Sequence, residues 1–279
     1  MSQSSEKNDS ETLEIRLLVD AILHRYGYDF RNYAEASFKR RVSRAVHKYG
    51  CGSIAEILHK TLTSPDFFSS LLNDLTVTVT EMFRDPSVYK VIREQVVPYL
   101  RTYPEIKIWF AGCASGEEVY SMAILLKEES LLDRCLLYGT DINPSALKRA
   151  KEGILDTSSL KDAAQRYFAT GGTSSLTSYY AANYGAALID SQLRQRLVFS
   201  DHNLVTDGVF GEMQLVFCRN ALIYFNRELH DRAIGLFAES LCSGGFLCLG
   251  TKESLSLSKH HGLFEDFSKR ERIFRKRRI

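Results

Sequence analysis

The residues best suited to chemistry lie in a turn that contains two glycines and follows an apolar stretch. Residues 108–110 are apolar, and residues 111–116 read AGCASG before two glutamates. In an open α/β sheet the first such turn lies where a nucleotide-like ligand rests against the backbone. Glycine there removes a Cβ that would block close approach. On this pattern alone, an ordinary tight turn of an α/β protein stays an alternative.

A second signal indicates the class of ligand. Asp141 ends the next predicted strand, where a carboxylate can accept hydrogen bonds from both ribose hydroxyls of an adenosyl ligand. The turn carries no basic cluster, which disfavours a polyphosphate, whereas Glu117 and Glu118 suit a cation. A ribose, no phosphates and a positive charge describe S-adenosylmethionine. For each glutamate taken singly, a simple complement to the helix dipole is an equally good interpretation.

Strands that alternate with helices must position these residues. We predict strands at 106–110, 135–138, 196–199, 213–218 and 244–250, and helices at 117–129, 144–152 and 227–241. This alternation predicts a parallel α/β sheet. The α/β domain should cover residues 104–279, with an insertion at about 157–199.

The first quarter of the chain predicts a small helical domain at residues 12–75, after a disordered stretch at 1–11. One helix carries an apolar stripe of Phe38, Val42, Ala45 and Tyr49. Another face of that helix carries the basic residues Arg40, Arg41, Arg44 and Lys48. A connector at 76–103 should be extended at 76–80 and helical to about residue 100.

Composition and charge narrow the class of protein. Of the 279 residues, 44% are hydrophobic and 25% are charged, as in an ordinary folded protein. We expect a cytosolic protein, since no apolar stretch nears the ~18 residues of a membrane helix and the polar N-terminus lacks a secretory apolar region. The six cysteines include no CxxC pair and predict buried, reduced thiols and no metal site.

The net charge of +2 is unevenly spread along the chain. Residues 31–50 carry +5 and residues 269–279 carry +6. Such asymmetry suggests an acidic partner. A solvated helix face and a frayed basic tail are the alternatives for these two patches.

With the string VFCRNALIYF at 216–225 added, the sequence resembles the CheR family of chemotaxis receptor glutamate methyltransferases. The resemblance covers essentially the whole chain and includes TEMFRD at 80–85, GCASGEE at 112–118, GTDI at 139–142 and LGTKESL at 249–255. It implies a Rossmann-like methyltransferase domain preceded by an all-helical domain. It also implies a monomer that transfers methyl groups from S-adenosylmethionine to chemoreceptor glutamates.

The resemblance implies a role for each matching residue. The implied cofactor-binding residues are Thr78, Thr80, Arg84, Gly112, Glu118, Asp141, Asn203, Leu204, Arg219 and Asn220. Within this set Glu118 would contact the methionine end, Asp141 the ribose, and Asn203 and Leu204 the adenine. The implied catalytic residues are Arg84 and Tyr224, facing the methyl group and the incoming carboxylate. The basic residues Arg40, Arg41, Arg44 and Lys48 would dock acidic receptor helices.

These residue types fit the implied chemistry. A glutamate is already ionised at pH 7, so methyl transfer to it needs no general base. The protein must hold two reactants in line, and Arg84 can orient a carboxylate with two parallel hydrogen bonds. For Tyr224, an aromatic core residue at a strand end is the alternative.

Other functions stay open at this point. A related enzyme could methylate another protein or a small carboxylate, and a sensing module could bind the cofactor without catalysis. A nucleic-acid methyltransferase should show a base-flipping pocket with stacking aromatics, and we see no such motif. Two features depart from the family: Thr78 stands where asparagine is frequent, and residues 169–199 differ from the enteric members. The latter carry a small β-subdomain there that docks a receptor C-terminal pentapeptide, so the difference argues against such a tether.

Overall fold

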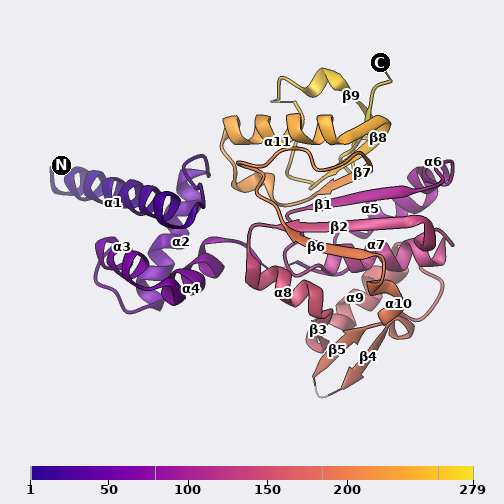
Figure 1. Ribbon diagram of the computed structural model, residues 1–279, viewed down its shortest axis with the longest axis horizontal. Helices are drawn as coiled ribbons and strands as arrows, with labels where there is room; N and C mark the ends of the chain where they lie inside the picture. The colour runs from indigo at the N-terminus through magenta and orange to yellow at the C-terminus, as the bar shows by residue number, and fades with distance from the viewer. Residues whose placement is uncertain (1, 79, 184, 257, 279) are drawn as a thin grey trace. The chain divides into compact units, whose positions relative to one another are not determined.

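The computed structural model describes residues 2–78, 80–183, 185–256 and 258–278, and side chains from residue 10 onward. The chain divides into two compact units (Figure 1). The helical unit comprises Met1–Val77 and Ile223–His230. The sheet unit comprises Thr78–Leu222 and Asp231–Ile279.

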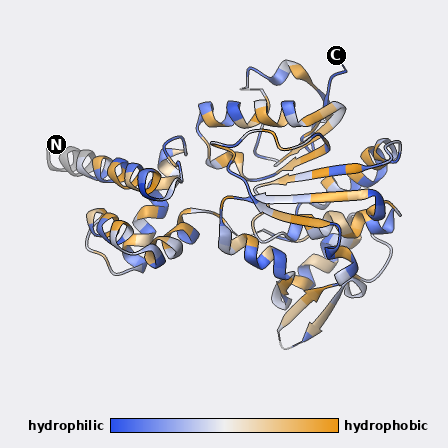
Figure 2. Ribbon diagram, viewed as in Figure 1, coloured by the Kyte–Doolittle hydropathy of each residue, from blue (hydrophilic) through white to orange (hydrophobic). Residues whose placement is uncertain are grey.

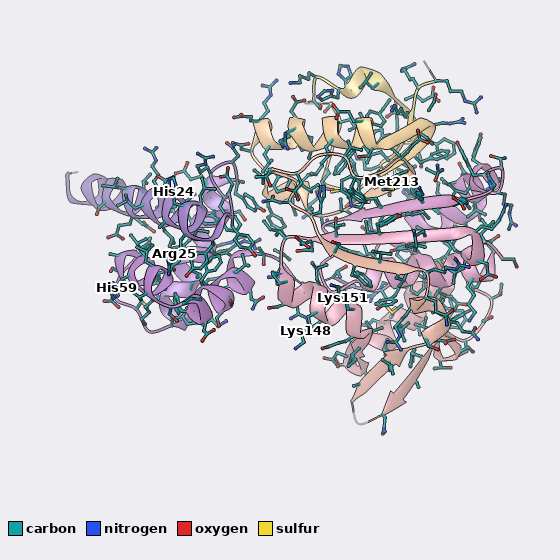
Figure 3. All side chains as sticks on the ribbon, in the orientation of Figure 1. His24, Arg25, His59, Lys148, Lys151 and Met213 are labelled. Carbon is teal, nitrogen blue, oxygen red and sulfur yellow. The ribbon has the colours of Figure 1, made fainter. Side chains whose placement is uncertain are left out.

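The helical unit contains α1 (Ser2–Tyr26), α2 (Glu35–Lys48), α3 (Ile54–Thr63) and α4 (Pro65–Leu75). Its core is an apolar cluster to which all four helices contribute. Ser53 and Ser64 cap α3 and α4, because each hydroxyl accepts the backbone N–H three residues ahead. His24 and Arg25 of α1 and His59 of α3 are exposed on this unit (Figure 3).

The start of α1 corrects one prediction. We expected residues 1–11 to be disordered, but α1 begins at Ser2; Met1 lies outside the described residues. No proline or glycine interrupts Ser2–Tyr26, so the helix can continue through its own backbone hydrogen bonds. The Glu11 carboxylate also lies 2.9 Å from the Lys39 ammonium of α2.

The sheet unit is built on a seven-stranded sheet in the order β6-β2-β1-β7-β8-β10-β9. Its strands are β1 (Ile106–Ala111), β2 (Cys135–Asp141), β6 (Leu197–Asp201), β7 (Met213–Cys218), β8 (Leu241–Leu249), β9 (Phe264–Ser268) and β10 (Ile273–Lys276). Strands β6, β2, β1, β7 and β8 run parallel, and β10 and β9 are added antiparallel. The predicted parallel α/β fold is therefore confirmed, with all five predicted strands in place.

Helices cover both faces of this sheet. In Figure 1, α11 (Arg227–Ser240) lies on one side, and α7 (Glu117–Glu128) and α8 (Pro144–Glu152) lie on the other. Trp109 of β1 packs edge-on against Phe237 of α11, whereas Phe110 belongs to the large cluster that includes α7. Hydrophobic and hydrophilic residues alternate along the ribbon of α11 in Figure 2, as expected of a helix with one buried face. Because β1 is flanked by β2 on one side and β7 on the other, the carboxyl end of β1 is the topological switch point of the sheet.

The connector departs from a single helix. It forms α5 (Pro86–Val91), a π-helical turn at Ile92–Val96, and α6 (Val97–Leu100). Pro98 lies in the first turn of α6 and has no N–H to continue an α-helical ladder, which accounts for the wider turn before it. Of the predicted extended stretch at 76–80, residue 79 lies outside the described residues and the others form no strand.

The insertion contains a second sheet whose strands the sequence analysis did not predict. Helix α9 (Thr157–Ala169) and the short α10 (Ser191–Arg194) accompany a three-stranded antiparallel sheet in the order β3-β5-β4. The strands are β3 (Ile154–Asp156), β4 (Tyr180–Asn183) and β5 (Ala186–Ile189). They are only three or four residues long, and β4 and β5 contain two alanines each, so local alternation is too weak to reveal them.

The basic C-terminal segment is not simply a frayed tail, because its residues Ile273–Lys276 form strand β10. Strand β10 lies between β8 and β9. The Lys276 ammonium donates to the carbonyl oxygens of Ala238 and Leu241 at 2.6 Å, at the end of α11. The Arg275 guanidinium lies 4.5 Å from the ring centre of Tyr99. Lys276 therefore caps the C-terminus of α11, and Arg275 forms a cation–π contact with Tyr99.

All six cysteines are buried free thiols, as predicted. Among the described residues, no helix is long and apolar enough to cross a membrane.

The packing of β2 against β6 gives a test of the fold. A Cβ at Gly139 would lie 2.6 Å from two ring carbons of Phe199. We expect Gly139→Ala to lower the free energy of unfolding by about 1–3 kcal/mol, because the ring must move out of its packed position. Urea unfolding measures this, with Gly208→Ala as the control, since a Cβ there meets nothing within 4 Å. Equal stability of the two variants would contradict the packing.

Candidate active site

The turn after β1 is held against the end of β2. The N–H groups of Gly112 and Cys113 both donate to the carbonyl oxygen of Thr140, at 2.8 and 2.9 Å. Gly112 and Gly116 have φ of +75° and +89°, in the region where glycine is favoured. A Cβ at Gly112 would lie 3.1 Å from the Cβ of Ala221, which follows β7. The turn therefore lies close to the ends of both neighbouring strands, as expected for a backbone cradle.

Asp141 is the buried carboxylate of this site. One oxygen accepts the N–H of Ala114 at 2.8 Å, and the other accepts the N–H of Asn143 at 2.9 Å. Burial raises the pKa of Asp141, and these backbone N–H groups oppose the shift. Each carboxylate oxygen retains capacity for a further hydrogen bond. The side chain is therefore oriented by two loops and can still accept from hydroxyl groups of a ligand.

Arg219 forms the centre of a buried charge cluster. Its side chain is fully buried and contacts Glu118 at the start of α7 and Asp85 of the connector, the latter at 2.5 Å. Burial alone would lower the pKa of Arg219, but the Glu118 carboxylate reverses this and raises it. Burial raises the pKa of Glu118, opposed by the Arg219 guanidinium. One guanidinium thus joins the end of β7 to two elements far away in the sequence.

The connector presents Arg84 between two strained residues. Phe83 and Asp85 have φ of +52° and +51°, which is unusual for residues other than glycine. The Phe83 N–H donates to the Ser121 hydroxyl at 2.9 Å, and the Arg84 carbonyl accepts from Arg219 at 3.1 Å. The backbone on both sides of Arg84 is therefore fixed from α7 and from β7. In the described part of the chain, no carboxylate forms an ion pair with the half-buried Arg84 side chain.

The remaining predicted cofactor residues of the sheet unit lie in loops. The Thr78 carbonyl accepts from the Ser115 hydroxyl of the turn at 3.2 Å, and Thr80 is half-buried. The side-chain oxygen of Asn203 accepts the Val205 N–H at 2.9 Å, so this oxygen is already engaged in a local turn. Leu204 is buried.

The structure brings together part of the predicted site. Glu118, Arg219 and the backbone of Arg84 are in direct contact, and Asp141 holds the turn that contains Gly112. Tyr224, in contrast, folds with the helical unit, where its carbonyl accepts the Ala34 N–H at 2.7 Å. The predicted action of Tyr224 with Arg84 stays a prediction.

The basic face of α2 is less free than the sequence indicated. The Arg41 guanidinium donates to the Leu75 carbonyl at 3.0 Å and lies 4.5 Å from the Tyr224 ring centre. Lys48 pairs with Asp74 at 2.6 Å. Arg40 and Arg44 are exposed, and within the described residues neither has an ion-pair partner. These two cations are the ones available to a partner.

Three residues that bond to the predicted site were not assigned a role from the sequence. Asp85, which pairs with Arg219, and Glu253, whose carboxylate accepts the Asn220 N–H at 3.1 Å, both lie within strings that carried the family resemblance. Ser121 carries no local signal, because its bond to the Phe83 N–H joins residues 38 positions apart. Among the described residues, no cluster of His, Cys, Asp or Glu could hold a metal ion.

Comparison with known proteins identifies the family. The model of the "CheR methyltransferase, all-alpha domain" matches residues 13–76, and that of the "CheR methyltransferase, SAM binding domain" matches residues 78–273. A Pseudomonas putida protein called Cher3 is 52% identical over 273 residues, covering 98% of this chain and 99% of its own. The chemotaxis protein methyltransferase of Listeria monocytogenes is 30% identical, covering 85% of this chain and 88% of its own. The chain belongs to the CheR family of S-adenosylmethionine-dependent methyltransferases.

Proposed function

We propose that this methyltransferase modifies glutamate side chains in the cytoplasmic domain of a chemoreceptor. The main support is the joint placement of a ribose-type carboxylate, Asp141, and a buried Arg219–Glu118 pair at the switch point of the sheet. The names of the relatives in Listeria and Vibrio, chemotaxis protein methyltransferases, support the sensory role. A cytoplasmic location and a monomeric state are part of the same proposal.

The residues present fit S-adenosylmethionine. The glycine turn lets the backbone pack closely against the end of β7, where a Cβ at Gly112 would lie 3.1 Å from the Cβ of Ala221. Asp141 beside this turn can accept from ribose hydroxyls. Glu117 and Glu118 are both acidic at the first turn of α7 and suit the cationic methionine end. Two buried polar atoms at the end of β7, Nε of Arg219 and Oδ1 of Asn220, have no partner among the described residues. Such atoms are expected where a polar ligand completes the hydrogen bonding.

The protein's part in the chemistry is orientation and charge screening. When bound, S-adenosylmethionine supplies the electrophilic methyl group. The acceptor glutamate is ionised near neutral pH and needs no proton removed. The Arg84 guanidinium can hold that carboxylate in line and reduce the repulsion from the nearby Glu118, whose pKa it also lowers. Its fixed backbone limits the entropy lost on binding.

The exposed cations of α2 are the proposed contact with the receptor. Arg40 and Arg44 can meet the acidic surface of receptor helices that present glutamates. Arg41 and Lys48 contribute to the same positive field, although Leu75, Tyr224 and Asp74 already engage them. Attraction of this kind acts mainly on association.

The ribose assignment can be tested by Asp141→Ala. We expect weaker binding of both S-adenosylmethionine and its demethylated product by ~1.5–3 kcal/mol, the usual range for hydrogen bonds to a charged group. Titration calorimetry measures both affinities. Asp201→Ala is a matched control, because Asp201 pairs in register with Asp141 on the neighbouring strand but is exposed. Wild-type affinity in Asp141→Ala would rule out the ribose contact.

The role of Arg84 can be tested by Arg84→Ala and Arg84→Lys. We expect single-turnover methyl transfer at saturating cofactor to fall by about a hundredfold in Arg84→Ala, because the acceptor loses its orientation. Arg84→Lys should recover little, since an ammonium lacks the planar fork. Cofactor affinity should change much less. If only the cofactor dissociation constant changed, Arg84 would be a cofactor ligand and not an acceptor-orienting residue.

The docking face can be tested by replacing Arg40 and Arg44 with glutamate. The Michaelis constant for the receptor should rise severalfold at low salt and less at high salt, because exposed charges are screened within ~8 Å at physiological ionic strength. The control replaces Lys148 and Lys151 with glutamate; both are exposed on α8 of the sheet unit (Figure 3). The measurement is the receptor methylation rate as a function of ionic strength for the wild type and both double variants. The same salt dependence in both double variants would show that the α2 cations are only solvated.

A further inference from the structure

We propose that Glu253 is a positioning residue, which fixes the backbone turn at Asn220 and thereby aims Arg219 into its charge cluster. The inference rests on the proposed cofactor site and adds a residue to which that proposal gives no role. Glu253 is the acidic residue of the LGTKESL string that follows β8.

Glu253 joins the ends of two neighbouring strands. Its side chain is buried, and one carboxylate oxygen accepts the N–H of Gly250 at 2.6 Å and the N–H of Asn220 at 3.1 Å. Gly250 follows β8 and Asn220 lies two residues beyond β7, and these strands are parallel neighbours. The Glu253 N–H also donates to the Gly250 carbonyl at 2.9 Å, which closes the turn around the carboxylate. A single oxygen atom therefore holds both loops at the carboxyl edge of the sheet.

The backbone at Asn220 requires such a restraint. Its φ is +59°, a left-handed conformation that asparagine tolerates but does not prefer. Surrounding contacts must stabilise that conformation, and the bond from Asn220 N–H to Glu253 is one of them. The packing is tight: a Cβ at Gly250 would lie 2.7 Å from the Glu253 carboxylate and 2.9 Å from the Asn220 nitrogen. Only glycine leaves space for this arrangement.

The turn sets the position of the residues on either side of it. Before it lies Arg219, whose guanidinium contacts Glu118 and Asp85 and donates to the Arg84 carbonyl. After it lies Ala221, whose Cβ is close to Gly112 of the glycine turn after β1. Loss of the carboxylate oxygen would leave the N–H groups of Gly250 and Asn220 without this acceptor. We therefore expect Arg219 and Ala221 to shift together, and cofactor affinity to fall.

Two variants distinguish whether Glu253 acts through the position of its acceptor oxygen or through its negative charge. Glu253→Gln keeps the length of the side chain and an amide oxygen that can accept both N–H groups. Glu253→Asp keeps the charge but withdraws the oxygen by one methylene. We expect Glu253→Gln to bind S-adenosylhomocysteine within about twofold of wild type and Glu253→Asp to bind at least tenfold more weakly. The Michaelis constant for the receptor should stay near wild type in both, because the acceptor surface is unchanged.

The measurements are titration calorimetry with S-adenosylhomocysteine, receptor methylation rates, and urea unfolding to show that each variant is folded. Glu265→Asp, an exposed carboxylate on β9, is the control. Wild-type binding in both variants, equal loss in both, or loss in Glu253→Gln alone would overturn the proposal. Failure of the proposed function itself would look different, because the wild-type enzyme would then bind S-adenosylhomocysteine but not methylate receptor glutamates.

Discussion

The buried charge of Arg219 is the constraint on which the site depends. A guanidinium without solvent contact must be paired, because an unpaired buried charge is strongly destabilising. Its partners, Glu118 and Asp85, come from α7 and the connector, and its third contact is the Arg84 carbonyl. The pairing therefore holds the connector, the helix after the glycine turn and the end of β7 in one arrangement.

Backbone strain in the same region has a related explanation. Phe83, Asp85 and Asn220 all adopt positive φ, and each is held by bonds to other elements: Phe83 by Ser121, Asp85 by Arg219, and Asn220 by Glu253. Such bonds offset the cost of the conformations. A site whose polar groups are fixed before a ligand arrives loses less entropy on binding, which suits a reaction that depends on alignment more than on proton transfer.

The family string at 216–225 serves both units of the chain. Its first part supplies β7 and Arg219 to the sheet unit, while Tyr224 and Phe225 fold with the helical unit. There Phe225 forms a β-bridge with Tyr33, and the Arg41 guanidinium forms a cation–π contact with the Tyr224 ring. Part of the basic charge on α2 thus stabilises the helical unit, so the charge left for a partner is smaller than a count of basic residues indicates.

Local patterns in the sequence were sufficient to predict the parallel strands, the glycine turn and the carboxylate at the end of β2. A strand can be predicted from a short apolar run, and a tight turn from its glycines, because both signals lie within a few residues. Motif strings identified the family before any geometry was known. Tertiary structure alone revealed the Arg219–Glu118 pair, 101 residues apart in the chain, and the bond from Asn220 to Glu253. It also turned the expected basic tail into β10. The physical reason is that ion pairs and edge-strand pairing join distant segments, and no local pattern records which distant partner a charged or β-forming residue will meet.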